Sequence, residues 1–296
     1  MRIIPLHLAA VGLFLAPVLG LGNSSAVAAA CAVCAIIAVL GIVELQSRRL
    51  DTRGLALLAG IAAIDSALRL AVVIGVAGFS PIFLLILATG YVFGTSYGFL
   101  CGTLVLAVSA IATGGVGPWL PYEMLAAGWV GAFAGIAGRR RTGAPSRRDV
   151  VVLCMVGLIS GFAYGALTDL WDWTTFYRGI PDIGWIPGLS LHEGIARFTR
   201  FYFTTSFTYD AFRAVGNAAM VIALGPAILF ALVRVRLRLS LQTEPVTADE
   251  PPLSMPATSS LPAAGDEVHD LTGEPLRPEA QLHQRGSLDQ ARRREF

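Results

Sequence analysis

The sequence contains no lysine: all 22 of the basic residues in this chain of 296 are arginine. This absence excludes two classes of site. A P-loop needs the lysine of its GxxxxGK[ST] motif, and a retinal or pyridoxal protein needs a lysine amine for its Schiff base. If ATP drives the work of this protein, a separate partner must therefore hydrolyse it.

Charge of either sign is also scarce. Only 14% of the residues are charged and 55% are hydrophobic, with a mean hydropathy of +0.66. A soluble domain carries about a quarter charged residues, and one membrane-spanning helix takes about 20 apolar residues. The composition therefore predicts an all-α polytopic membrane protein.

There are only four cysteines, and two of them form a CxxC pair, Cys31 and Cys34. The pair lies inside AVAAACAVCAIIAVL, an apolar run without polar neighbours. Redox and zinc sites need thiolates, which apolar surroundings disfavour. We therefore expect a packing role for this pair, and we expect no metal site, cofactor or nucleic-acid partner.

Long apolar runs predict eight spans, at 3–21, 26–45, 55–77, 81–97, 98–113, 122–138, 150–168 and 208–233. Cytoplasmic loops accumulate arginine. Arginines cluster at residues 48–53, 139–148 and 234–238. Eight spans that begin inside put all three clusters in the cytoplasm, which predicts a multi-pass plasma-membrane protein with both termini cytoplasmic.

The same runs divide the chain into three parts. Residues 1–47 form two N-terminal transmembrane helices, and the first is either a retained span, which we favour, or a signal peptide. Residues 48–238 form a six-helix membrane core. Residues 239–296, rich in Pro, Glu, Ser and Gln, are too polar to offset chain entropy by burial and are expected to form a disordered cytoplasmic tail.

The predicted outer loops, at 22–25, 78–80, 114–121 and 169–207, gather the aromatic residues. All five tryptophans lie in or near them: Trp119, Trp129, Trp171, Trp173 and Trp185. An aromatic belt is one explanation, although a belt ordinarily marks both interfaces and the cytoplasmic edge has no tryptophan. A site for a flat organic molecule is the other explanation.

Charges inside spans are costly and need a reason. Asp65 and Arg69 are four residues apart on one helix face, which favours a structural ion pair over a site for a transported ion. In the last span, Asp210 falls in the first turn, and Arg213 and Asn217 follow at greater depth. Their side chains are predicted to contact a polar ligand or to bond between helices, and the sequence leaves both alternatives open.

Small residues recur every fourth position in the third run, at Ala59, Ala63, Ala67 and Ala71. Such a strip lets a second helix approach closely. The sequence alone does not separate an internal contact from one with another protein.

One central stretch, GYVFGTSYGFLCGTLVLAVSAIATGGVGPWLPYEMLAAGWVGAFAGIAG, resembles the substrate-specific (S) components of energy-coupling factor (ECF) vitamin transporters. The matching features are the Gly-rich entry at 94–102, Gly-Pro-Trp at 117–119 and Pro-Tyr-Glu-Met at 121–124. The alanine strip and the final TYDAFRAVGNAAMVIALGP also fit, so the resemblance covers about residues 55–236.

The resemblance implies a six-helix ECF S-component core, here with two additional N-terminal helices, that captures a vitamin on its outer face. It implies as partners an ECF transmembrane coupling protein, which contacts Ala59, Ala63, Ala67 and Ala71, and two ABC-type ATPases. Loops 78–80, 114–121 and 169–207 are then expected to close over the ligand. The candidate substrate-binding residues are Trp119, Tyr122, Glu123, Trp129, Trp171, Trp173, Asp210, Arg213 and Asn217.

Many aromatics and few fixed charges favour a large neutral ligand over anionic biotin or cationic thiamine. Cobalamin is therefore the first expectation and riboflavin the second, and no catalytic activity is expected. One alternative is a membrane enzyme acting on a diphosphate-activated lipid, since Asp169 and Asp172 have a DxxD spacing that can share Mg²⁺. Such enzymes usually carry a second acidic motif, which is not found. Another alternative is an assembly protein without a ligand.

Overall fold

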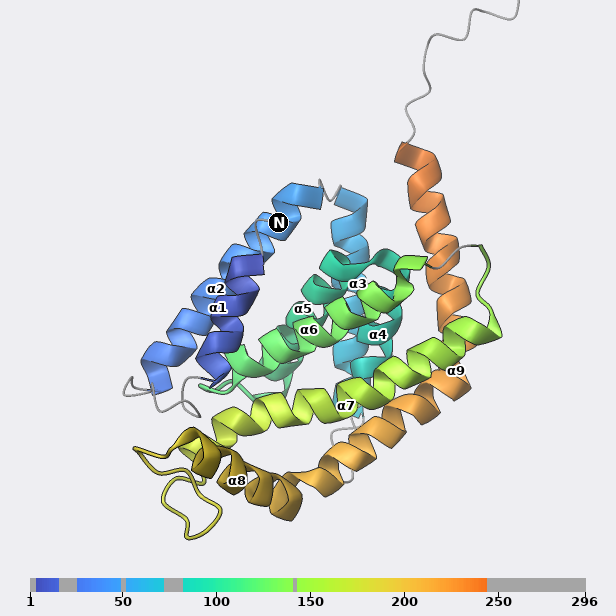
Figure 1. Cartoon of the computed structure of the whole chain (residues 1–296). Helices are drawn as coiled ribbons and strands as arrows, with labels where there is room; N and C mark the ends of the chain where they lie inside the picture. Colours follow the sequence, from blue (N-terminus) through green and yellow to red (C-terminus); the bar gives the residue numbers. More distant parts are fainter. Residues whose placement is uncertain (1–3, 16–25, 49–51, 72–81, 141–142, 244–296) are drawn as a thin grey trace, which may run out of the picture. The chain divides into compact units, whose positions relative to one another are not determined.

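A computed structural model describes residues 4–15, 26–48, 52–71, 82–140 and 143–243. Every regular element in these ranges is helical, as the composition predicted, and no strand occurs in them (Figure 1). The elements are α1 (Ile4–Leu15), α2 (Ala26–Arg48), α3 (Thr52–Ala71), α4 (Ile82–Phe93), α5 (Thr95–Thr113), α6 (Leu120–Ala137), η2 (Gly138–Arg140), α7 (Arg147–Thr175), α8 (Leu191–Phe201), η3 (Tyr202–Ser206) and α9 (Phe207–Thr243).

Three helical stretches of the described chain are long and apolar enough to cross a membrane. They are Thr95–Thr113, Arg147–Thr175 and the continuous stretch Leu191–Leu239. Shorter apolar helices occur at Pro5–Leu15, Cys31–Val43 and Phe83–Phe93. Membrane localisation is compatible with these helices, whereas the count of eight spans stays a prediction.

The predicted long outer loop at 169–207 is wrong at both of its ends. Helix α7 continues to Thr175, and the chain is helical again from Leu191. Continuous backbone hydrogen bonding explains the extension, because Asp172 still accepts from the N–H of Phe176. Only residues 176–190 form the loop, so several predicted loop residues lie on a rigid helix.

Other boundaries also shift. Helices α4 and α5 meet at Gly94, whose φ of 98° suits glycine, rather than between residues 97 and 98. Helix α9 runs to Thr243, so the first residues assigned to the tail are helical. Residues 244–296 and the loops predicted at 22–25 and 78–80 lie outside the described residues.

Glycines set how closely the central helices approach. A Cβ at Gly98 of α5 would meet the carbonyl of Gly131 on α6, and a Cβ at Gly131 would meet that of Gly98. Small residues at facing positions allow this close packing of two backbones. The glycine-patterned sequence after the Pro-Tyr-Glu-Met motif is therefore the α6 side of a tight α5–α6 pair.

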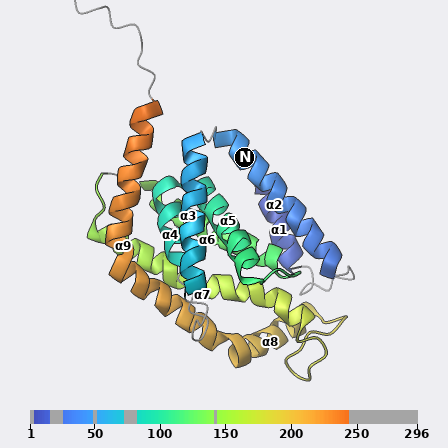
Figure 2. The same cartoon turned by 180° about the vertical axis from the view of Figure 1, so that it is seen from behind.

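A second glycine series joins α7 to α9, which lie side by side in both views (Figures 1 and 2). Gly157, Gly161 and Gly165 lie four residues apart on α7. A Cβ added to them would contact Asn217, Ala214 and Asp210 of α9, respectively. This series aligns the polar residues of α9 along α7 and so fixes where they point.

The two N-terminal helices share a hydrophobic core with α6, α7 and α8. Phe14 of α1 packs edge-on against Tyr122 of α6, with ring centroids 5.1 Å apart. His7 accepts a hydrogen bond from the indole of Trp129 over 3.1 Å. These contacts brace the beginning of α6 from the side of α1.

Helix α3 packs against α5 and α4, and its outer side is uncovered in the view from behind (Figure 2). Ala59, Ala63 and Ala67 are all exposed. A Cβ added at the neighbouring Gly60 would meet nothing within 4 Å. Within the described part of the chain, these three alanines therefore take no part in the internal packing, which was one of the two alternatives. Ala71 ends the helix, and its side chain lies outside the described ones.

The predicted direct ion pair between Asp65 and Arg69 is wrong. Both carboxylate oxygens of Asp65 are buried and make no hydrogen bond within the described part of the chain. Arg69 instead donates to the Ser109 hydroxyl of α5 over 2.7 Å. The guanidinium of Arg69 still attracts Asp65 electrostatically, but the group that accepts its hydrogen bond lies on α5.

Candidate binding pocket

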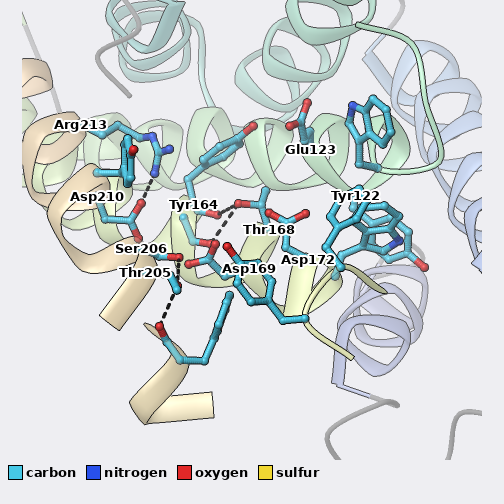
Figure 3. A pocket seen from close by; sticks show the side chains of 17 residues that line it. Tyr122, Glu123, Tyr164, Thr168, Asp169, Asp172, Thr205, Ser206, Asp210 and Arg213 are labelled. Atoms are coloured by element: carbon cyan, nitrogen blue, oxygen red, sulfur yellow. Dashed lines mark hydrogen bonds and ion pairs between the residues drawn. The ribbon is translucent and has the colours of Figure 1, made fainter. Parts of the chain in front are cut away.

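A cavity of about 520 Å³ lies where the beginning of α6, the last turns of α7, η3 and the first turns of α9 meet (Figure 3). Its wall combines aromatic, hydroxyl and charged side chains. The aromatic residues are Trp119, Tyr122, Tyr164, Trp171, Phe176, Tyr177, Phe201 and Tyr209. The charged residues are Glu123, Asp169, Asp172, Asp210 and Arg213.

Helix α7 supplies the floor of the cavity through one face. Tyr164, Thr168 and Trp171 recur at intervals of four and three residues, with Asp169 and Asp172 beside them. Such spacing places side chains one above the other on a helix. Because α7 extends to Thr175, all five are held by regular helix.

The beginning of α6 supplies the opposite wall. The Trp119 carbonyl accepts the N–H groups of Tyr122 and Glu123 over 3.0 and 3.1 Å, which starts the helix. Pro121 lies in the first turn and Glu123 at the positive end of the helix dipole, as the sequence predicted. Two neighbouring positions of one turn thus point an aromatic and an acidic side chain at the cavity.

The aromatic residues form a continuous cluster at one side. Trp171 is the centre: its ring lies 6.1 Å from Trp119, 6.2 Å from Tyr122 and 5.3 Å from Phe176, measured between centroids. Edge-to-face and tilted rings at these separations attract one another. The cluster therefore presents a preformed apolar surface to a ligand.

The other side is polar. Asp210 forms a salt bridge with Arg213 and accepts a hydrogen bond from Tyr202 over 2.9 Å. Arg213 also lies over the Tyr164 ring, 5.3 Å from its centroid, and donates to the carbonyl of Gly161 over 3.5 Å. Asp210 is in the first turn of α9, as predicted.

Residues Tyr202–Ser206 form a π-helical turn between α8 and α9. Such turns are rare and occur frequently at functional sites. Here the turn carries Thr205 and Ser206 into the cavity wall.

A search of protein families, curated proteins and solved structures found no match.

Six of the nine predicted binding residues line this cavity: Trp119, Tyr122, Glu123, Trp171, Asp210 and Arg213. Trp129, Trp173 and Asn217 do not. Trp129 faces α1, where it contacts His7. Trp173 is fully buried and donates to the carbonyl of Ile183 over 2.7 Å.

Asn217 makes a hydrogen bond between helices, which was one of the two alternatives that the sequence left open. Its side chain is 3% exposed and donates to the carbonyl of Gly157 over 3.1 Å. We expect Asn217→Ala to lower the stability by about 1 kcal/mol, because one interhelical hydrogen bond is lost. Thermal unfolding in detergent measures this. A weakened ligand affinity without a change in stability would contradict it.

The sequence did not indicate Asp169 and Asp172 as binding residues, although both line the cavity. The predicted loop began at Asp169, and the pair was considered only for a shared Mg²⁺. Among the described residues no group of three or more metal-ligating side chains comes together. The signal that identifies them as pocket residues is helical spacing: Asp169 follows Gly165 by four residues and Asp172 follows Thr168 by four, and Gly165 and Thr168 also line the cavity.

Proposed function

We propose that this protein captures a small ring-containing micronutrient outside the cell and presents it to a separate ATP-driven import module. This is the role of the S component of an ECF transporter. The observation that carries the proposal is the cavity between α6, α7 and α9, which combines an aromatic cluster with convergent polar groups. Ligand sites typically have this composition and a volume of about 300–1,000 Å³.

The arginines support an outward orientation of the cavity. Helices α6, α7 and α9 each have cavity residues toward one end and arginines toward the other: Arg139 and Arg140 follow α6, Arg147 and Arg148 begin α7, and Arg234, Arg236 and Arg238 lie late in α9. Arginine-rich ends face the cytoplasm. The cavity then lies at the outer side of the membrane.

The volume also bears on the ligand's size. About 520 Å³ suits a molecule of two or three fused rings. A molecule of riboflavin's size therefore fits this cavity better than cobalamin, whose corrin ring carries an additional nucleotide arm. We accordingly reverse the order of preference drawn from the sequence.

The exposed alanine strip of α3 supports the proposed partner. Ala59, Ala63 and Ala67 face away from the protein's own core, and small residues permit close approach of a foreign helix. We propose that the coupling protein binds here and recruits two ABC-type ATPases. Because the chain has no lysine, it has no P-loop of its own, so ATP-driven import would need such separate ATPases.

The proposal is tested by titrating purified protein with thiamine, riboflavin, biotin and cyanocobalamin, with tryptophan fluorescence as the signal. Trp119 and Trp171 line the cavity, so an occupant changes their emission. We expect saturable binding of one compound. No saturable change with any of them, together with no growth rescue of vitamin auxotrophs that carry the coupling module, contradicts the proposal.

Removing the indole of Trp119 is expected to raise the dissociation constant of the bound vitamin by about tenfold, since an aromatic wall of the cavity is lost. The matched control is Phe133→Ala on α6, because Phe133 is 40% exposed and outside the cavity. Fluorescence or calorimetric titration of both variants measures the difference. Equal affinities of Trp119→Ala and Phe133→Ala would contradict the assignment of this wall.

The enzyme alternative uses the same cavity, because Asp169 and Asp172 both line it. Two carboxyl groups one helical turn apart can share a divalent cation, and a diphosphate needs such a cation beside these acidic residues. Hydrolysis or transfer of a prenyl diphosphate that depends on Mg²⁺ and is lost in Asp172→Asn would favour this function over transport.

A further inference from the structure

The charges around the cavity are unbalanced. Four acidic side chains line it, Glu123, Asp169, Asp172 and Asp210, against one basic side chain, Arg213. The imbalance is visible in Figure 3, where the carboxyl groups surround the open space and the guanidinium lies at one edge beside Asp210. The composition of the whole chain, with a formal net charge of +2, gives no sign of it.

The basic groups near the cavity are already engaged. Arg213 is held by Asp210, by the carbonyl of Gly161 and by the Tyr164 ring. Arg69 of α3 does not line the cavity; it attracts Glu123 electrostatically and donates to Ser109. Among the described residues, Glu123, Asp169 and Asp172 form no ion pair. Asp169 and Asp172 lie one helical turn apart on α7.

A second observation, independent of the charge imbalance, concerns Asp169. Its side chain is only 8% exposed, and its Oδ2 atom makes no hydrogen bond within the described part of the chain. The Ser206 hydroxyl bonds to the Asp169 carboxyl group, yet Oδ2 is left without a partner among the described residues. The other neighbouring hydroxyl groups are engaged: Thr168 donates to the carbonyls of Tyr164 and Gly165, and Thr205 to that of Phe201. A buried carboxyl oxygen without a donor is costly, so a donor from a ligand is expected here.

We propose that the captured nutrient is an organic cation whose charged nitrogen binds between Asp169 and Asp172 and whose ring lies against the Trp119–Trp171 cluster. This inference rests on the proposed function and narrows its substrate class to cations. It replaces the preference for neutral riboflavin, which rested on size alone. A positive nitrogen supplies the missing charge and gains from the faces of nearby indoles. A carboxylate or phosphate ligand would instead meet two unpaired acidic residues. Thiamine, disfavoured on sequence grounds, has the required chemistry.

The first experiment compares ligands of different charge on the full-length protein in detergent by calorimetry. Thiamine is the cationic probe, riboflavin the neutral one and biotin the anionic one. We expect thiamine to bind most tightly. Riboflavin or biotin binding without thiamine overturns this inference and leaves the proposed function standing, whereas no binding by any of the three overturns the inference and counts against the function as well.

A pair of probes with the same ring isolates the charge. 1-Methylnicotinamide is a cation and nicotinamide is neutral, and otherwise they differ by one methyl group. We expect 1-methylnicotinamide to displace bound thiamine, or to bind directly, at a concentration at least about tenfold lower than nicotinamide does, as a charge-assisted contact implies. Equal potency of the two compounds overturns the inference.

The second experiment replaces the carboxyl group without changing its shape. Asp169→Asn is expected to raise the dissociation constant of thiamine by at least about tenfold. The matched control is Asp182→Asn, because Asp182 is exposed in the 176–190 loop and its φ of 62° suits asparagine. Thermal unfolding shows that both variants are folded. Unchanged thiamine affinity in a folded Asp169→Asn overturns the inference.

Discussion

Replacing Gly161 with leucine is expected to force α7 away from α9 and to remove most of the correctly folded protein. A Cβ at this position already meets the backbone of Ala214, and the remaining leucine atoms have no space between the two helices. Overpacking at such a site costs about 3 kcal/mol or more, which corresponds to a fall in melting temperature of about 10 °C. Size-exclusion profiles and thermal unfolding in detergent measure both effects.

Gly41→Leu in α2 is the matched control, because a Cβ added there meets nothing within 4 Å. It makes the same chemical change inside a helix and should leave the elution profile unchanged. If Gly161→Leu and Gly41→Leu behave alike, then α7 and α9 are not packed as described. The cavity would lose its geometric basis as well, since Asp210 is held over Gly165 by the same packing.

Ala63→Leu is expected to leave ligand affinity unchanged and to reduce ATP-driven uptake by about tenfold or more. Ala63 is exposed on the outer face of α3, so the larger side chain disturbs no internal contact. A foreign helix that approaches along the small-residue strip would meet it directly. Calorimetric binding and uptake of the same radiolabelled vitamin, measured side by side, separate the two effects.

The control for this prediction is Ala219→Leu, which places the same side chain on an exposed position of α9. It should support normal uptake. Pull-down of the coupling protein by each variant adds a direct readout. Normal uptake by Ala63→Leu, or an equal loss with Ala219→Leu, would show that the strip on α3 is not the partner surface.

The sequence predicted correctly the features that depend on local physics. Apolar run length indicated the helices, and Pro121, Glu123 and Asp210 were placed in first turns because helix dipoles and capping act over one turn. The one-sided distribution of tryptophans left an aromatic belt and a ligand site as alternatives, and two of the five tryptophans line the cavity. These signals were sufficient to find six of the cavity's residues.

The features that depend on rotation about a helix axis could not be predicted in the same way. Trp119 immediately precedes α6 and Trp129 lies at its middle. Only Trp119 faces the cavity, because α1 packs against Trp129. Asn217 follows Arg213 by one turn but lies against Gly157. Tertiary contacts with α1 and α7 decide these directions, and no local pattern encodes them.

The acidic pair was missed for a different reason. The predicted end of the seventh span at residue 168 placed Asp169 and Asp172 in a loop, where their spacing has no defined direction. Extending α7 by seven residues to Thr175 places Asp169 four residues after Gly165 and Asp172 four residues after Thr168, so both line the cavity. Because the predicted helix end was two turns too early, the sequence did not show that the pocket is acidic.

The central claim is that a small molecule occupies the cavity between α6, α7 and α9. It is tested most directly by mass spectrometry of compounds released from purified wild-type protein and from Thr168→Trp, whose indole fills the cavity. We predict one near-stoichiometric compound in the wild type and its loss from a Thr168→Trp variant of unchanged thermal stability. The same amount of the compound in both proteins, or none in the wild type, would contradict the claim.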